Sequence, residues 1–302
     1  MFRFLVLLAF ILGVSSSDFT AAVNQRPLSV AVLDFGKTAT GRLVADQLAH
    51  TLVAGDRNLP GFQVVDRDQA RAAALGAGYQ GSLNMSLQEA RDLASAIGCD
   101  FFLAGDAQTL RRSPSEGPVY FESYAAIYLV SGRTGKLISW ERASARRASL
   151  GEAEKALLLE LAAPDVLSRY QKMIRSAQEK EGAERASAVE TTAPIIELTS
   201  DDETDGNRDV RAPRPFRRLK PQYPETAARA EVEAVVDVLV DIDARGEVGR
   251  VEIARWAGYG LDQSVLDTVK QLHFFPAMRE EVPMPMRVLL RYNFRRPPRQ
   301  DR

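Results

Sequence analysis

Residues that build metal centres and disulfides are almost absent from this chain. Its 302 residues include one cysteine, Cys99, and two histidines, His50 and His273. One cysteine excludes a disulfide within the chain, and these three residues give no zinc ligand set with the required spacing. We therefore expect neither a metal nor another cofactor. Cys99 begins an apolar strand pattern and is interpreted as a small buried hydrophobic residue.

A dominant charge of one sign is also lacking. The 39 basic and 40 acidic side chains give a formal net charge of −1. This balance provides no overall attraction to nucleic acid or to an anionic membrane, so we expect no nucleic-acid partner. No nucleophile elbow or similar catalytic motif is present, and the carboxylates are typical of solvated surfaces. The sequence therefore predicts a protein that is not an enzyme.

Long hydrophobic runs are limited to one, at residues 4–14. This run follows Met1-Phe2-Arg3 and precedes Ser15-Ser16-Ser17, which is the layout of a secretory signal peptide. About eleven helical residues reach roughly 16 Å, whereas the hydrocarbon core of a bilayer is about 30 Å thick. We expect cleavage after Ser17, so that residues 1–17 are a signal peptide and the mature protein is periplasmic. The alternative is an uncleaved segment that anchors the chain in the inner membrane.

Two glycine-rich stretches resemble nucleotide-binding loops by spacing only. Residues 36–43 lie between a strand pattern and a helix pattern, but Arg42-Leu43 replaces the Lys-Ser/Thr pair of a phosphate loop. The lysine that reaches the phosphates and the hydroxyl that binds magnesium are therefore both missing. Residues 76–81 have the spacing G-x-G-x-x-G, but they follow an alanine-rich helix pattern instead of a strand. We interpret them as a flexible connector, so a nucleotide-binding hypothesis rests on residues 36–43 alone.

The first folded domain is expected over residues 27–176. Apolar strand patterns alternate with amphipathic helix patterns in its first half. Ser86 and Glu89 form a capping box before a helix that Gly98 ends. Three strands and one closing helix follow, at about residues 100–110, 119–130, 136–146 and 150–176. This order predicts an α/β domain with a mixed sheet.

Residues 177–214 differ in composition from both of their flanks. They are charged, polar and poor in apolar residues, with an acidic run at residues 201–205. Such a segment cannot bury enough apolar surface to offset the entropy lost on ordering, so we expect a charged, disordered linker. As a flexible coil its nearly forty residues span about 30–40 Å. Attraction between the acidic run and the basic run at residues 214–220 would be screened by salt.

The most regular pattern of the chain lies in its last eighty residues. Apolar and polar residues alternate over residues 233–243, which predicts a half-buried strand, and Gly246 supplies the positive φ of a tight hairpin to a second strand at residues 248–255. Asp262 opens a helix, where a carboxylate interacts favourably with the helix dipole, and Pro276 is expected to end it. With a final strand after the helix, this order predicts a three-stranded antiparallel sheet packed on one helix.

Several motifs in residues 215–297 combine into a family resemblance. They are Tyr223-Pro224 before a short helix pattern, a valine-rich strand that ends in Asp-x-x-Gly, Leu261-Asp262 at the helix start, Phe-x-Pro-Ala after the helix, and a closing strand that ends at Phe294. In this combination the segment resembles the C-terminal domain of TonB-family proteins. The family usually has a glycine shortly before the first strand, where this chain has Ala230-Glu231-Val232-Glu233.

The final strand, residues 286–294, is expected at an edge of the sheet. An edge strand exposes unpaired N–H and C=O groups, to which a partner peptide can add a strand. The resemblance implies that this edge holds the energy-coupling segment of an outer-membrane receptor. The alternative is that Arg287, Arg291, Arg295 and Arg296 only protect the edge by their charge. The candidate partner-binding residues are Arg287, Val288, Leu289, Leu290, Arg291, Tyr292 and Asn293.

A second resemblance covers the first domain and is built on shorter motifs. Residues 30–35, 62–67, 97–105 and 134–137 resemble the periplasmic domain shared by CsgG-like and TolB N-terminal proteins. The resemblance implies a non-catalytic α/β domain that binds proteins or helps to assemble envelope structures. The membrane-spanning hairpins of a secretion pore have no counterpart, because residues 119–140 are too short and too polar.

Together these features predict an α+β protein of two domains, an α/β domain with a mixed sheet and a small antiparallel sheet packed on one helix. We expect a periplasmic TonB-family protein of energy-transduction type, which binds an extended peptide of an outer-membrane receptor or transporter. An ExbB–ExbD-type motor is the implied second partner. The alternative is a structural adaptor in an envelope assembly or secretion system, without energy coupling. Small sheets with free edges can pair, which allows a homodimer.

Overall fold

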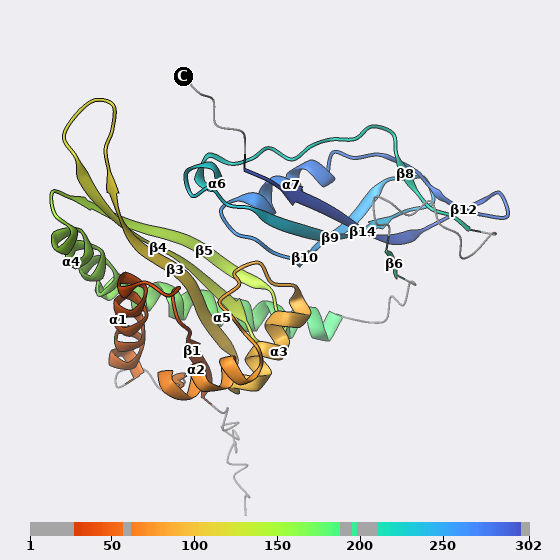
Figure 1. The fold of residues 1–302 in the computed structure, drawn as a ribbon. Coiled ribbons are helices and arrows are strands. Elements are labelled where there is room, and N and C mark those ends of the chain that lie inside the picture. The colour runs from red at the N-terminus through yellow and green to blue at the C-terminus, as the bar shows by residue number, and fades with distance from the viewer. Residues whose placement is uncertain (1–26, 57–61, 188–194, 198–209, 297–302) are drawn as a thin grey trace, which may run out of the picture.

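The structure is a computed structural model that describes residues 27–56, 62–187, 195–197 and 210–296. These residues form two units, each built on a sheet, that lie against each other (Figure 1). The expected signal segment lies outside the described residues. Within the described ranges, no helix is both long enough and apolar enough to cross a bilayer.

The N-terminal unit contains a five-stranded sheet of mixed direction, as the sequence predicts. The strand order is β2–β1–β3–β4–β5, with β1 (Leu28–Val32), β2 (Phe62–Val64), β3 (Phe101–Arg112), β4 (Tyr120–Ser131) and β5 (Leu137–Arg147). β1 is parallel to both of its neighbours, whereas the β3–β4 and β4–β5 pairs are antiparallel. The chain runs from β1 to β2 and then back past β1 to β3, so right-handed connections place the intervening helices on opposite faces.

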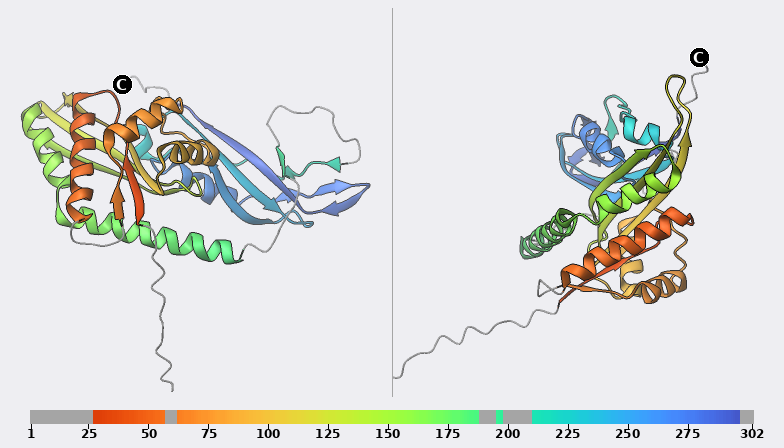
Figure 2. Two further views of the ribbon diagram at one scale, coloured as in Figure 1. Left: turned by 90° about the horizontal axis from the view of Figure 1, so that it is seen from below. Right: turned by 90° about the vertical axis from the view of Figure 1, so that its left-hand side faces the viewer.

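Helices cover both faces of this sheet, and Figure 2 shows them from two further sides. α1 (Ala39–Asp56), α4 (Leu150–Leu161) and α5 (Pro164–Ser187) pack on one face. α2 (Arg67–Gly76) and α3 (Leu87–Ile97) pack on the other face. Successive residues of a strand point to opposite faces, so Phe102 joins the core under α2 and α3, whereas Leu103 joins the core under α1 and α4. Cys99 is buried, as predicted, and burial raises the pKa of its thiol to about 12.

The predicted helix boundaries of this unit are confirmed at α3 and wrong at the end of the unit. Ser86 and Glu89 form the capping box of α3, and Gly98 ends the helix with a φ of 77°. The single helix expected over residues 150–176 is instead two helices. α4 ends at Leu161, and α5 begins at Pro164, which has no N–H to donate and therefore suits a first helical position. α5 continues to Ser187, into the segment that the sequence assigns to the linker.

The C-terminal unit has the predicted order of short helix, strand, strand, helix and strand. These elements are α6 (Glu225–Arg229), β9 (Ala234–Ile242), β10 (Val248–Arg255), α7 (Leu261–Val269) and β14 (Met286–Phe294). β10 and β14 flank β9, and both are antiparallel to it. The alternating Val236, Val238, Val240 and Ile242 of β9 are buried in one core with Val265 and Val269 of α7. The small antiparallel sheet packed on one helix is therefore confirmed.

Short ribbons extend this unit beyond the predicted pattern. The prediction that Pro276 ends the helix is wrong, because α7 ends at Val269. Leu272 and Phe274 are buried at alternating positions, which suits an extended chain better than a helix. Two short strands that precede α6 pair with the extended chain after α7. β8 (Arg214–Pro215) pairs with β11 (Phe274–Phe275), and β7 (Val210–Arg211) pairs with β12 (Ala277–Arg279). β12 also pairs with β13 (Val282–Met284).

Candidate peptide-binding edge

All seven predicted binding residues lie on β14, which pairs with β9 over its whole length. Val288 is fully buried, and Leu290 and Tyr292 pack partly into the same core. By the alternation of a strand, Arg287, Leu289, Arg291 and Asn293 lie on the opposite face of the sheet. The strand therefore has one face fixed in the core and one face that carries polar side chains.

The two arginines of this strand bind carboxylates on the face of the sheet. Arg291 donates to both carboxylate oxygens of Asp237, at 2.7 and 3.0 Å. Arg287 binds both oxygens of Asp241 in the same way. This hydrogen bonding raises the pKa of the Arg287 guanidinium. Each of the two arginines is therefore held across the ladder by an aspartate of β9. The alternative that Arg287, Arg291, Arg295 and Arg296 protect the edge by their charge stays a prediction.

The register of the ladder identifies the backbone groups of β14 that face outward. Val235 of β9 lies opposite Asn293, but its N–H donates to the Asn84 side chain at 3.0 Å and its carbonyl accepts from that side chain at 2.7 Å. Val235 and Asn293 are therefore a non-hydrogen-bonded pair of the antiparallel ladder. Every second residue repeats this arrangement, so Asn293, Arg291, Leu289 and Arg287 direct their N–H and C=O groups away from β9.

A strand from the linker occupies part of this outer edge. β6 (Ile195–Glu197) runs parallel to β14, with Ile195 opposite Arg287 and Glu197 opposite Leu289. The sheet order is therefore β10–β9–β14–β6, and β14 lies between two neighbours over three residues. The prediction that β14 lies at an edge of the sheet is therefore wrong over residues 287–289, where the added strand belongs to the chain itself.

Next to this sheet, the loop after β10 joins the C-terminal unit to the face of the N-terminal sheet. The rings of Trp256 and Tyr259 pack on Tyr128 of β4, with ring centroids 5.7 and 6.2 Å apart. The Trp256 indole N–H donates to the carbonyl of Gly135 at 3.0 Å, and the Tyr128 hydroxyl donates to the carbonyl of Ala257 at 3.1 Å. Both side chains are buried, so these hydrogen bonds satisfy polar groups that water cannot reach.

Polar contacts extend this interface on the side of α3. The Asn84 side chain donates to the carbonyls of Val235 and Trp256, both at 2.7 Å. Arg255 forms an ion pair with Glu89 at 2.9 Å and donates to the carbonyl of Asn84 at 2.9 Å. Apolar residues of both units belong to one continuous core. The C-terminal unit is therefore packed on the N-terminal unit and is not separated from it by a free tether.

Asp262 holds the loop in the shape that this interface requires. Its carboxylate accepts from the N–H groups of Ala257 at 2.8 Å and Gly258 at 2.7 Å. Burial raises the pKa of Asp262 to about 6, and the two backbone hydrogen bonds oppose this shift. The sequence assigns Asp262 to the helix dipole, and it lies in the first turn of α7, but its contacts are with the loop that precedes the helix.

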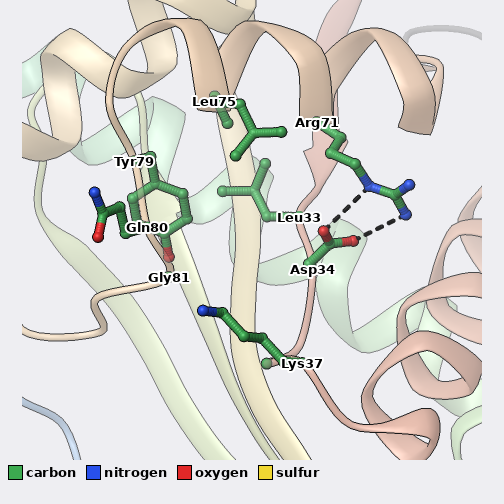
Figure 3. Close-up of a pocket in the computed structure, with 10 residues that line it drawn as sticks. Leu33, Asp34, Lys37, Arg71, Leu75, Tyr79, Gln80 and Gly81 are labelled. Atoms are coloured by element: carbon green, nitrogen blue, oxygen red, sulfur yellow. Dashed lines mark hydrogen bonds and ion pairs between the residues drawn. The ribbon is translucent and has the colours of Figure 1, made fainter.

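The two glycine-rich stretches line a single cavity of about 380 Å³ (Figure 3). It lies at the carboxyl end of β1, between Asp34, which binds Arg71 of α2 at 3.1 Å, and Tyr79 of the connector before α3. Gly41 is required by packing, because a Cβ there would lie 2.0 Å from the carbonyl oxygen of Phe35. Lys37 lines the cavity, whereas Arg42 and Leu43, which replace the Lys-Ser/Thr pair of a phosphate loop, do not. Among the described residues, no three His, Cys, Asp or Glu side chains gather as metal ligands would.

The interface was missed by sequence reasoning. Its signal in the sequence is the run Trp256-Ala257-Gly258-Tyr259-Gly260, with two large aromatic residues among small ones. Gly258 has a φ of 73°, and a Cβ there would lie 2.5 Å from the Tyr128 ring and 2.9 Å from the Trp140 ring. The small residues therefore let the backbone approach the aromatic rings, which cannot be deduced without knowledge of the opposing surface.

Comparisons with known proteins support the C-terminal assignment. A family model described as the C-terminal part of the Gram-negative bacterial TonB protein matches residues 220–295. A search of the curated proteins finds no match. The resemblance of residues 27–176 to CsgG-like and TolB N-terminal proteins stays a prediction.

Solved structures with partial similarity come from several Gram-negative bacteria. The TonB C-terminal domain of Pseudomonas aeruginosa is 17% identical, with a TM-score of 0.26, and the match covers 36% of this chain and 100% of that one. Lipoprotein GNA1162 from Neisseria meningitidis is 18% identical, with a TM-score of 0.31 and coverages of 48% and 99%. The LpoB C-terminal domain from Salmonella enterica is 15% identical, with a TM-score of 0.27 and coverages of 41% and 87%. Similarities at this level carry no conclusion about activity.

The family match and the observed order of elements agree with each other. The matched segment begins just before Tyr223-Pro224 and ends just after β14, so it contains α6, the three antiparallel strands and α7. Residues 220–295 of this chain are a TonB C-terminal domain.

Proposed function

We propose that the outer edge of β14 binds an extended peptide of an outer-membrane receptor or transporter by strand addition, in a periplasmic protein without catalytic activity. The observation that carries this proposal is the pairing of β6 with Arg287 and Leu289, because an added strand at this edge is compatible with the rest of the fold. The family match of residues 220–295 supports a TonB-type role for the same segment.

Peptide binding at this edge requires the displacement of β6. The contact involves three residues on each strand, and each backbone hydrogen bond contributes about 0.5–1.5 kcal/mol net. A partner peptide that pairs with all of residues 287–293 forms more such bonds and therefore binds more tightly than the linker strand. The face of β14 stays fixed during this exchange, because Asp237 and Asp241 hold Arg291 and Arg287 from the other strand.

The binding experiment uses the full chain and a synthetic peptide with the energy-coupling segment of an outer-membrane receptor. We expect the peptide to slow hydrogen exchange of backbone amides at residues 287–293 and to leave residues 248–255 of the opposite edge, β10, unchanged. Protection that falls on β10, or on neither strand, contradicts the proposal.

A pair of variants at one position separates the contribution of the backbone to peptide binding from that of the side chain. Asn293→Pro removes an N–H that faces outward while the ladder with β9 keeps its hydrogen bonds, so we expect at least fivefold weaker binding of the peptide. Asn293→Ala keeps the N–H and is the matched control, with affinity within twofold of the parent. Equal affinities of the two variants would show that the main chain of this residue does not contact the peptide.

The second candidate function is a structural adaptor without energy coupling. The interface of Trp256 and Tyr259 with Tyr128 favours it, because a C-terminal unit packed on the N-terminal unit cannot reach far on a flexible linker. Fractionation of cells distinguishes the two. An uncleaved form in the inner membrane favours energy transduction with an ExbB–ExbD-type motor, and a mature periplasmic form favours the adaptor. Sedimentation at several concentrations tests the homodimer.

A further inference from the structure

The ribbon of β8 and β11 carries two exposed aromatic rings. Phe216 and Phe275 are 59% and 56% exposed, and their ring centroids are 4.3 Å apart. The backbone fixes this arrangement, because Phe275 lies opposite Arg214 in the β8–β11 pair and the N–H of Phe216 donates to the carbonyl of His273 at 2.8 Å. Paired and alternate residues of a ribbon share a face, so Arg214, Phe216 and Phe275 point to the same side, while Phe274 is buried on the other.

Positive charge surrounds these rings, and no carboxylate of the described residues pairs with it. Residues 211–220 contain five basic side chains and no acidic one, namely Arg211, Arg214, Arg217, Arg218 and Lys220. All five residues are exposed, and none of their side chains forms an ion pair with a described residue. The neighbouring carboxylate of Glu247 is engaged by His273, at 3.2 Å. We call Phe216, Phe275 and these five residues the aromatic–basic surface.

We propose that the aromatic–basic surface binds an anionic lipid bilayer, with the two phenylalanine rings in the headgroup region and the cations at the lipid phosphates. Each basic residue near an anionic surface adds to the attraction, which is weak for one residue and substantial for five together. An aromatic ring placed at the boundary of headgroups and acyl chains adds burial of apolar area, which a purely electrostatic contact lacks.

Charge distribution explains why a bilayer would select this surface. The formal net charge of the chain is −1, so the chain outside the five cations is net acidic and is repelled by an anionic bilayer. Binding is therefore expected in one orientation, with the β8–β11 ribbon toward the lipid. This contact does not involve β14, so it can coexist with a peptide on the edge, and it does not depend on the proposed peptide binding.

The test uses the full chain with two kinds of vesicle, phosphatidylcholine alone and phosphatidylcholine with 30 mol% phosphatidylglycerol, a composition chosen for the experiment. We expect at least tenfold tighter binding to the anionic vesicles at about 50 mM salt, and loss of most of this preference at about 500 mM salt, where charges are screened. The anionic vesicles should also slow hydrogen exchange at residues 212–218 and 273–276. The hydrophobic residues 4–14 contribute to binding to both kinds of vesicle, so they do not produce the preference for the anionic ones.

Variants assign the effect to its residues. Arg217→Gln with Arg218→Gln should weaken binding to anionic vesicles at least tenfold, and Phe216→Ser with Phe275→Ser should weaken it severalfold. Lys155→Gln with Lys180→Gln, at exposed positions on α4 and α5, is the matched charge control and should have little effect. Equal binding to both kinds of vesicle overturns the proposal. Protection of residues 212–218 by an oligoglutamate peptide but not by anionic vesicles also overturns it, and would assign the surface to an acidic protein partner.

Discussion

The two sheets of the molecule differ in what covers them. The N-terminal sheet is enclosed on both faces, and β4 is buried continuously from Glu122 to Ser131. The C-terminal sheet packs one face on α7, while its other face carries the ion pairs of Arg287 and Arg291. A sheet enclosed on both faces leaves no surface for a partner, whereas a sheet with a polar face and an accessible edge can accept a strand.

The enclosure of the first sheet depends on the second unit. α2 and α3 cover part of one face, and the loop around Trp256 and Tyr259 covers the part over Tyr128. The C-terminal unit therefore acts as a structural layer of the N-terminal unit. Changes at this loop should affect the stability of both units, and changes at the β14 edge should affect binding alone.

The largest effect is expected from Trp256→Ala. The change removes a fully buried indole and its hydrogen bond to Gly135, and large-to-small aromatic substitutions cost about 3–5 kcal/mol. Because this contact couples the units, we expect one urea transition in the parent and two in the variant. Differential scanning calorimetry measures the loss of stability, and circular dichroism during urea denaturation measures the number of transitions. One unchanged transition would mean that the two units unfold together without this contact.

A matched pair of tryptophan substitutions sharpens this result. The buried indole N–H of Trp140 has no hydrogen-bond partner among the described residues, whereas that of Trp256 donates to Gly135. Trp256→Phe leaves the Gly135 carbonyl unpaired and should cost about 1–3 kcal/mol. Trp140→Phe removes an unsatisfied donor and should cost clearly less. A larger loss for Trp140→Phe would show that ring size, and not hydrogen bonding, determines the stability of the interface.

The next effect is a dependence of stability on pH through Asp262. Burial raises its pKa to about 6, above the ordinary aspartate value of about 3.9. The folded state therefore binds the proton more tightly, so this contribution to stability is fully present below about pH 4 and is lost as the pH rises through about 6. We expect a loss of about 1–3 kcal/mol across this window, measured by urea denaturation, and no such loss in Asp262→Asn. If the hydrogen bonds from Ala257 and Gly258 outweigh burial, the sign reverses and the parent gains stability with pH.

A smaller effect is expected from the linker strand. Replacement of residues 195–197 by Gly-Ser-Gly weakens the pairing with Arg287 and Leu289. The outward amides of these residues should then exchange faster, and a receptor peptide should bind about fivefold to tenfold more tightly, which corresponds to about 1–1.4 kcal/mol. The same replacement at residues 191–193 is the control. Faster exchange with unchanged peptide affinity would mean that β6 and the peptide do not compete for the edge.

The sequence predicts the C-terminal sheet well because one of its faces is polar. The period of two in Val236, Val238, Val240 and Ile242 identifies β9, and β10 and β14 have the predicted bounds. β4 shows no such period because both of its faces are buried. Its apolar run still predicts a strand, but it does not reveal that the C-terminal unit covers one of its faces. The predicted end of α7 is wrong because the prediction relied on Pro276 as a helix breaker. The helix ends earlier, at Val269, and Leu272 and Phe274 are buried at alternating positions of an extended chain. Contacts between distant segments, such as β6 on β14, leave no local signal.

The smallest effect concerns the turn before β9, where the TonB family usually has a glycine. Glu231 occupies this turn with a φ of 51°, a left-handed conformation that costs a residue with a side chain about 1 kcal/mol. Its carboxylate also binds Arg296 at 3.0 Å, an exposed ion pair that contributes little. Glu231→Gly should therefore raise the free energy of unfolding by up to about 1 kcal/mol, whereas Glu231→Ala loses the ion pair without relief of the backbone and should lower it slightly. Equal values for the two variants in urea denaturation would mean that the turn is not strained, and that this chain tolerates glutamate there without cost.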